Sequence, residues 1–243
     1  MSTYVYGIVL DSHPAGVAEL RGVGETPGPV RTVDADGLKA VVGDAPPDLR
    51  AKRRDLKAHQ DVLAALIEQG PVLPMRFGLV AQDEQAVAGA VAARKDDYRA
   101  VLSELDGRVE MNVKVAHQQD AVLGALLRQD RELAGLNEQL RGRGGGTRDE
   151  QIRFGELVAG ALTERQRRDS EALSAMLGEH AVRESSGPQV DGCFFNSSFL
   201  VDRDELDDFT SVVDHLRRTL DQVAEVRLRG PLPPYSFAGG NRD

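Results

Sequence analysis

The chain has 243 residues, of which 41% are hydrophobic and 28% charged, a composition typical of a soluble globular protein with one large or two modest domains. Its formal net charge of −9 at pH 7 argues against a nucleic-acid-binding protein with a domain-wide basic face. No run approaches the roughly 18 apolar residues of a membrane-spanning helix, and the first residues lack the pattern of a signal peptide. One cysteine, Cys193, excludes an internal disulfide, so we expect a cytoplasmic protein.

The first half of the chain predicts a sheet covered by helices. Residues 4–10 are apolar on both strand faces and rich in aromatic and β-branched side chains, as in a central strand. Residues 30–35 and 38–42 predict a hairpin, because Asp36-Gly37 accepts the positive φ angles of a type I′ turn. Three further elements are expected in chain order: a helix from about residue 48 to 67, a strand over 72–80, and a helix behind the N-cap Asp83.

The second half begins with strict alternation over residues 109–115, which predicts a strand with one buried face. Two long helices, over about 122–140 and 149–180, are joined by the flexible Gly142–Gly146 and predict an antiparallel helical hairpin. Residues 163–171 contain no apolar side chain, so a solvent-exposed projection is expected there. The remaining elements are a strand within 190–201, an Asp202/Glu205 capping pair, a helix over 206–220 and a strand over 224–229.

This order of elements predicts an α+β fold with helices on sheet faces and two domains. The first domain is expected over residues 1–107 and the second over 108–243, with the helical hairpin at about 118–180 and a proline-rich tail over 230–243. The second domain is similar to a ferredoxin-like split βαβ element with the long hairpin inserted.

Patterns that carry catalysis or metal binding are missing from the sequence. None of the five histidines has a partner at metal-ligand spacing, and Gly142–Gly146 follows a helix and lacks a phosphate-loop ending. Cys193 precedes Phe194-Phe195 in an apolar strand, where burial makes a thiol inert. We therefore predict no catalytic residue, no cofactor and no metal.

Two proline-containing segments are candidates for binding a partner. Pro71–Gly78 carries two prolines and Arg76, and is either a kinked edge strand locked by the arginine or a contact surface. Pro231–Phe237 either folds back over its own sheet or docks on a partner. The candidate partner-binding residues are Pro74, Arg76, Phe77, Pro233, Pro234, Tyr235 and Phe237.

A cluster of basic side chains lies near the predicted start of the first long helix. Its members are Arg50, Lys52, Arg53, Arg54 and Lys57. Basic residues there oppose the helix dipole, which favours acidic groups at an N-terminus. The cluster is either a solvated helix face or a binding face for an acidic partner.

Three stretches together resemble the signature segments of the gas vesicle protein F/L family: Tyr4–Ile8, Pro71–Gly78 and Gly230–Phe237. Their order and spacing also fit, so the resemblance spans nearly the whole chain. It implies a two-domain α+β fold with a ferredoxin-like element. It also implies a non-enzymatic, minor structural or accessory protein of gas vesicles, the hollow protein shells that provide buoyancy.

The same resemblance implies partners. These are the hydrophobic major shell protein, which family members keep from aggregating during nucleation, and other minor vesicle proteins. Neither nucleic acid nor a membrane is an expected partner. The proline-marked edge at Pro71–Gly78, or the tail, is the expected contact, since capture of a β-rich subunit needs an exposed strand edge or an apolar groove. The alternative is a small-ligand sensor or an enzyme on a ferredoxin-like scaffold, which requires a pocket with convergent ionisable groups.

Overall fold

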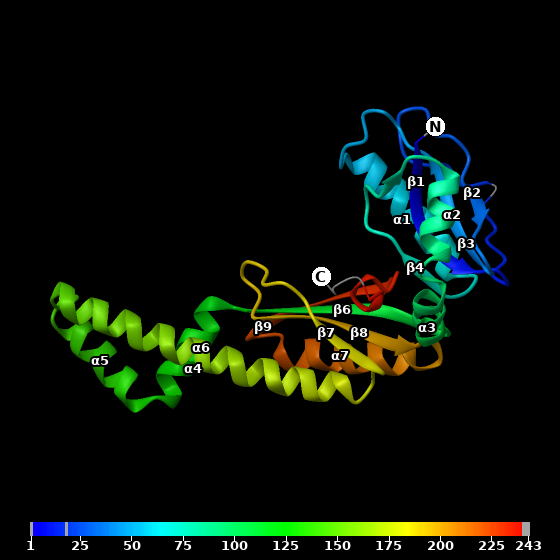
Figure 1. Ribbon diagram of the computed structural model, residues 1–243. Helices are drawn as coiled ribbons and strands as arrows, with labels where there is room; N and C mark the ends of the chain where they lie inside the picture. Colours follow the sequence, from blue (N-terminus) through cyan, green and yellow to red (C-terminus); the bar gives the residue numbers. More distant parts are fainter. Residues whose placement is uncertain (1, 18, 240–243) are drawn as a thin grey trace. The chain divides into compact units, whose positions relative to one another are not determined.

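The computed structural model describes residues 2–17 and 19–239 (Figure 1). These residues form a mixed fold of helices and sheets, as the sequence predicts. The chain divides into two compact units. Unit 1 comprises residues 1–111, 200–203 and 230–243, and unit 2 comprises residues 112–199 and 204–229, as far as each is described.

The sheet of unit 1 is built around β1, which pairs antiparallel with β3 on one side and with β4 and β5 on the other. Its strands are β1 (Thr3–Leu10), β2 (Arg31–Asp34), β3 (Leu38–Asp44), β4 (Val72–Pro74) and β5 (Val80–Ala81). Asp36 and Gly37 have φ angles of 52° and 80°, as a type I′ turn requires. The hairpin prediction is confirmed.

Helices cover both faces of this sheet, which explains why β1 is apolar on both sides. They are α1 (Arg53–Ile67), α2 (Glu84–Ala92) and α3 (Lys95–Leu105). Leu63 and Leu66 of α1 pack with Tyr4 and Tyr6 on one face. Residues of α2 and α3 pack with Val5 and Ile8 on the other. Asp83 caps α2 as expected, because its side chain accepts from the Ala86 N–H.

The single strand expected over residues 72–80 was wrong. It is divided into β4 and β5, because Gly78 turns the backbone between them with a φ angle of 94°. The helix expected from residue 48 begins at Arg53.

The second sheet has the strand order β7-β8-β6-β9. Its strands are β6 (Arg108–His117), β7 (Arg183–Ser186), β8 (Phe195–Asp202) and β9 (Ala224–Leu232). The sequence did not predict β7, since Arg-Glu-Ser-Ser has no apolar residue and resembles a loop. The expected Asp202/Glu205 capping pair was also wrong: Arg203–Glu205 forms a short 3-10 turn, and Asp202 pairs with Arg108 at 2.9 Å.

Four helices belong to unit 2: α4 (Gln119–Gln129), α5 (Arg131–Gly142), α6 (Arg148–Gly178) and α7 (Leu206–Leu220). The second part of α6 and α7 lie along one side of the strands, whereas α4, α5 and the start of α6 extend past the strand ends (Figure 1). The helix predicted over 122–140 is two helices, because the Asp130 carboxylate accepts from the N–H groups of Glu132 and Leu133 and starts a new helix.

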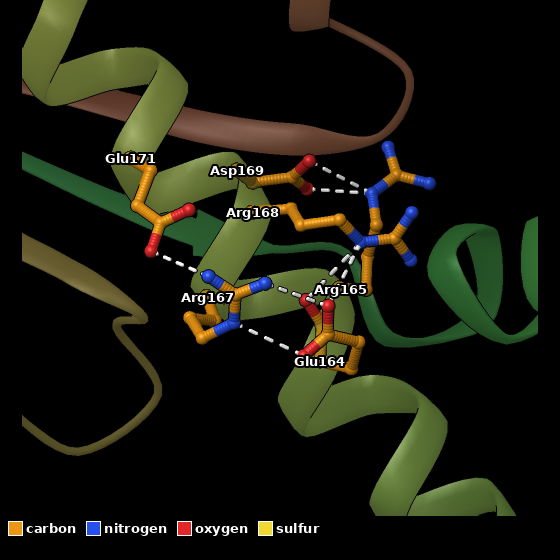
Figure 2. A network of polar contacts seen from close by, with 6 residues as sticks. All are labelled: Glu164, Arg165, Arg167, Arg168, Asp169 and Glu171. Carbon is orange, nitrogen blue, oxygen red and sulfur yellow. Dashed lines mark hydrogen bonds and ion pairs between the residues drawn. The ribbon is translucent and has the colours of Figure 1, made fainter.

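The exposed projection expected at residues 163–171 lies elsewhere, in the segment that extends past the strands. Within 163–171, Asp169 bonds to His117 at 2.9 Å and the Ser170 hydroxyl donates to the Phe194 carbonyl at 3.1 Å. Figure 2 shows how the charged side chains satisfy one another: Arg167 donates to Glu164 and Glu171, and Arg165 to Asp169. Charged residues can therefore line a helix beside a sheet because they are paired.

Candidate partner-binding surface

A buried histidine lies at the centre of the candidate surface. The amphipathic pattern of α1 turns His59 toward the sheet, where it is almost fully buried. Its Nε2 lies 3.1 Å from the Met75 carbonyl oxygen and 2.9 Å from the Tyr235 hydroxyl. A carbonyl only accepts, so Nε2 carries the proton and Nδ1 accepts from the Tyr4 hydroxyl at 2.9 Å. His59 is therefore held as one neutral tautomer.

Aromatic rings surround this histidine. The Tyr6 ring stacks on His59 with 5.6 Å between the ring centroids. The Phe77 ring lies edge-on to both His59 and Tyr4, with centroid distances of 5.8 Å and 6.0 Å. We call Tyr4, Tyr6, His59, Phe77 and Tyr235 the His59 cluster. Burial lowers the pKa of His59, strongly raises the pKa of Tyr4, and raises the pKa values of Tyr6 and Tyr235 to about 12. All five side chains are uncharged near neutral pH.

The cluster brings together the two segments that the sequence singled out. Phe77 comes from Pro71–Gly78 and Tyr235 from the tail, and both contact His59. Of the candidate residues, Pro74, Pro234 and Phe237 are buried, Phe77 and Pro233 are half-buried, and Arg76 and Tyr235 are exposed. The histidine that joins the segments was not predicted, because its role depends on contacts between residues far apart in the sequence.

The described part of the tail folds back within unit 1. The N–H and hydroxyl of Ser236 both donate to the buried Glu110 carboxylate at 2.8 Å. Phe237 is 3% exposed and packs with Leu105 and Leu200. Residues 240–243 of the predicted tail lie outside the described residues. Contact of the tail or of Pro71–Gly78 with a partner stays a prediction.

Exposed apolar side chains gather around the His59 cluster. Among the described residues of unit 1, the exposed large hydrophobic side chains are Leu56 (37%), Leu79 (46%), Val80 (42%) and Tyr235 (39%). Val80 lies opposite Tyr4 in the β1–β5 pairing, so both side chains are on the α1 face of the sheet. Leu56 is one helical turn before His59. We call Leu56, Phe77, Leu79, Val80 and Tyr235 the apolar rim.

Part of the basic cluster predicted from the sequence lies beside this rim. Arg53 and Lys57 flank Leu56 on the exposed face of α1. Lys57 pairs with Asp61 at 2.6 Å, Lys52 pairs with Glu25, and Arg54 pairs with Asp55. Within the described residues, Arg50 and Arg53 are exposed and have no carboxylate in ion-pairing distance.

A cavity of about 390 Å³ opens near the start of α1, between residues 23–28, 44–48 and 52–55. Burial acts to raise the pKa of Asp55 at its wall, but the Gly24 N–H and Arg54 outweigh burial, so the pKa is lowered and the carboxylate is ionised. The Gly24 N–H and Arg54 thus hold Asp55 as a carboxylate in the first turn of α1.

Neither a metal centre nor a membrane span is present in the part of the chain that the structure describes. No group of three or more histidine, cysteine, aspartate or glutamate side chains converges there. No helix among these residues is both long and apolar enough to cross a membrane. Cys193 is half-buried rather than fully buried as expected, and it is unpaired.

The family model described as gas vesicle synthesis protein GvpL/GvpF matches residues 2–239. The chain is 44% identical to gas vesicle protein F of Streptomyces sp. (strain CB03234), over 98% of this chain and 99% of that protein. It is 30% identical to gas vesicle protein L of the same organism, over 97% of this chain and 92% of that protein.

The comparison of folds also points to this family. The crystal structure of gas vesicle protein GvpF from Anabaena sp. PCC7120 superposes with a TM-score of 0.84 at 25% sequence identity, over 99% of both chains. The resemblance found in the three signature stretches is thereby confirmed. This chain belongs to the gas vesicle synthesis protein GvpL/GvpF family.

Proposed function

We propose that this protein is an accessory component of gas vesicle assembly that binds the hydrophobic major shell protein and prevents its aggregation during nucleation. The observation that carries the proposal is the apolar rim, in which the exposed large hydrophobic side chains described in unit 1 gather around one cluster. Exposed apolar side chains that lie together mark interaction sites more often than scattered ones do. The net charge of −9 would keep a captured complex in solution.

The sheet edge beside the rim suits this role. The edge strands β4 and β5 are short and pair only with β1, and Pro74 cannot donate a backbone hydrogen bond. A long, regular edge would invite uncontrolled strand addition. We infer that capture uses the side chains of Leu79 and Val80 more than a continuous backbone ladder. The protein would thus hold an apolar subunit reversibly.

The test is co-expression with the shell protein, measuring how much of it stays in the soluble fraction. Leu79→Ser combined with Val80→Ser should lose most of the solubilising effect. The matched control, Ile152→Ser with Val182→Ser, removes two equally exposed apolar side chains of unit 2 and should keep it. With folding verified by circular dichroism, equal solubilisation by both double variants would refute a role for the rim.

We also propose the finer architecture predicted from the sequence: domains over residues 1–107 and 108–243, the second ferredoxin-like with the hairpin at about 118–180 inserted. The element order β6, α4–α6, β7, β8, α7, β9 supports the second domain, because it follows β-α-β-β-α-β with extra helices in the first crossover. The first segment of unit 1 ends at Met111, which supports a boundary near residue 107, although residues 200–203 and 230–239 pack with unit 1.

We further propose that the protein acts without catalysis, at the gas vesicle in the cytoplasm, with other minor vesicle proteins as partners and without nucleic acid or membrane. The best place for a small ligand is the cavity beside Asp55. Of the charged side chains that line it, all except Asp48 are engaged in ion pairs with described residues, which favours a protein that works through its surface.

A further inference from the structure

We infer that the apolar rim and the adjacent basic residues Arg50, Arg53 and Lys57 form one docking surface for an acidic protein segment, in which carboxylates flank apolar side chains. The inference rests on the proposed function, since it names the chemistry of the partner that the rim receives. It goes beyond that function because it assigns the basic cluster, which the ferredoxin-like fold and the ion pairs of unit 1 leave unexplained.

The geometry makes the surface continuous. Val80 lies opposite Tyr4, and the Tyr4 hydroxyl contacts His59. Tyr235 also contacts His59 directly. Helical side chains lean toward the helix N-terminus, so His59 leans over the turn that carries Leu56. Val80, Tyr235 and Leu56 are therefore each close to His59 or to one of its partners, and Leu79 precedes Val80 in the chain. Arg53 and Lys57 flank Leu56 on the same helix.

The charge of this surface differs from that of the whole molecule. The chain carries nine more acidic than basic groups, yet Arg50 and Arg53 are exposed without a carboxylate partner among the described residues. Basic residues at a helix start act against the helix dipole, so they do not serve the stability of α1. A partner that supplies carboxylates would remove both unfavourable effects. Charge complementarity of this kind acts on partner choice and association rate more than on total affinity.

A protein segment fits better than an anionic membrane. Sequences that bind anionic lipid surfaces carry about four to eight basic residues in a cluster or on an amphipathic helix. Here only Arg50 and Arg53 are unpaired, and the apolar residues come from a helix, a short strand and the tail. Such a composite surface can recognise a folded or extended chain of defined shape, whereas a lipid surface requires no shape.

The first experiment measures binding of two short synthetic peptides to the full-length protein by fluorescence anisotropy. In one peptide Glu flanks Leu and Val, and in the other Lys replaces every Glu. The acidic peptide should bind about tenfold more tightly at low salt, and the difference should shrink as salt rises. Arg50→Glu with Arg53→Glu should abolish the preference. The matched control, Arg148→Glu with Arg153→Glu on α6, changes the net charge equally and should retain it.

Two results would overturn the inference directly: equal affinity of the protein for both peptides, or an unchanged preference for the acidic peptide in Arg50→Glu/Arg53→Glu. A third would be that phosphatidylglycerol vesicles bind the wild-type protein, compete with the acidic peptide for it, and do not bind the double variant. The double variant Leu79→Ser/Val80→Ser should bind both peptides less tightly by the same factor, because it removes apolar contacts and leaves the charges in place. Loss of discrimination in this variant would contradict a surface with separate apolar and basic parts.

Co-expression with the shell protein separates this inference from the proposed function. If wild type fails to solubilise the shell protein, the proposed function fails, while the peptide preference still supports an acidic partner. If wild type solubilises it and Arg50→Glu/Arg53→Glu does so equally well, the proposed function stands and the acidic-partner inference fails.

Discussion

Two buried histidines of unit 1, His13 and His59, have the same hydrogen-bonding arrangement. In each ring Nε2 donates to a backbone carbonyl, of Leu66 for His13 and of Met75 for His59. Nδ1 accepts, from the Ala15 N–H in one case and the Tyr4 hydroxyl in the other. Protonation of Nδ1 in either ring would break the hydrogen bond that this atom accepts. Burial lowers both pKa values, and the carbonyls oppose this only in part.

The lowered pKa values predict a fall in stability on mild acidification. The unfolded histidines have pKa values near 6.5 and bind protons before the folded ones do. Their contribution to the free energy of unfolding is complete above about pH 6.5. It decreases below that pH, by at most about 1.4 kcal/mol per pH unit for each histidine. Urea unfolding at several pH values between neutrality and the range of carboxylate titration measures the slope.

His59→Phe serves as the control. It keeps a ring in the cluster but leaves the Tyr4 hydroxyl and the Met75 carbonyl without this partner, so it should cost about 2–3 kcal/mol at neutral pH. It should also reduce the pH slope, because the contribution of His59 is removed and that of His13 remains. A slope that is unchanged in this variant would mean that other groups cause the acid sensitivity.

At the scale of helices and strands, the sequence predicted what local pattern determines. The apolar run of β1, the Asp36-Gly37 turn and the Asp83 cap all depend on neighbouring residues, and all three are confirmed. The strand β7 could not be predicted, because it forms by pairing with β8 and not by its own propensity. Of the candidate surface, the sequence predicted the two proline-marked segments and the basic cluster. Leu56, Leu79 and Val80 have no local signal, since their exposure follows from the tertiary fold.

The break between α4 and α5 leads to a prediction about Asp130. Asp130→Ala should destabilise α5 by about 1 kcal/mol, because two N–H groups at its start lose their acceptor. Hydrogen exchange at the Glu132 and Leu133 amides should accelerate. Gln129→Ala, at the neighbouring exposed position, should leave both rates unchanged. Equal rates in the two variants would show that the carboxylate is not what starts α5.

At the scale of the whole molecule, segments from both ends of the described chain belong to unit 1. β1 and the described part of the tail belong to the same unit, and residues 112–199 and 204–229, which lie between them in the sequence, form the other unit. Glu110, Leu105 and Leu200 receive Ser236 and Phe237, so the tail is part of the interior of unit 1. A deletion of the tail therefore cannot test partner binding alone.

Removal of residues 231–243 should destabilise unit 1 by about 3–5 kcal/mol, the cost of losing a buried phenylalanine. The Glu110 carboxylate would also lose both donors from Ser236. Hydrogen exchange should show the loss of protection in β1 and β3. Tyr235→Phe, which removes only one hydroxyl from the cluster, should cost about 1 kcal/mol. Unchanged protection in the truncated protein would contradict an interior role for the tail.

The position of Phe237 also bears on how the protein is made. Domains generally fold as they are synthesised, with the N-terminal part first. Here Phe237, which packs in the interior of unit 1, is translated after the residues of unit 2. The Tyr4–His59 site of a nascent chain would therefore lack Tyr235 until all of unit 2 had been synthesised. The proposed docking surface would thus be incomplete in unfinished chains, which should bind the partner less tightly than the finished protein does.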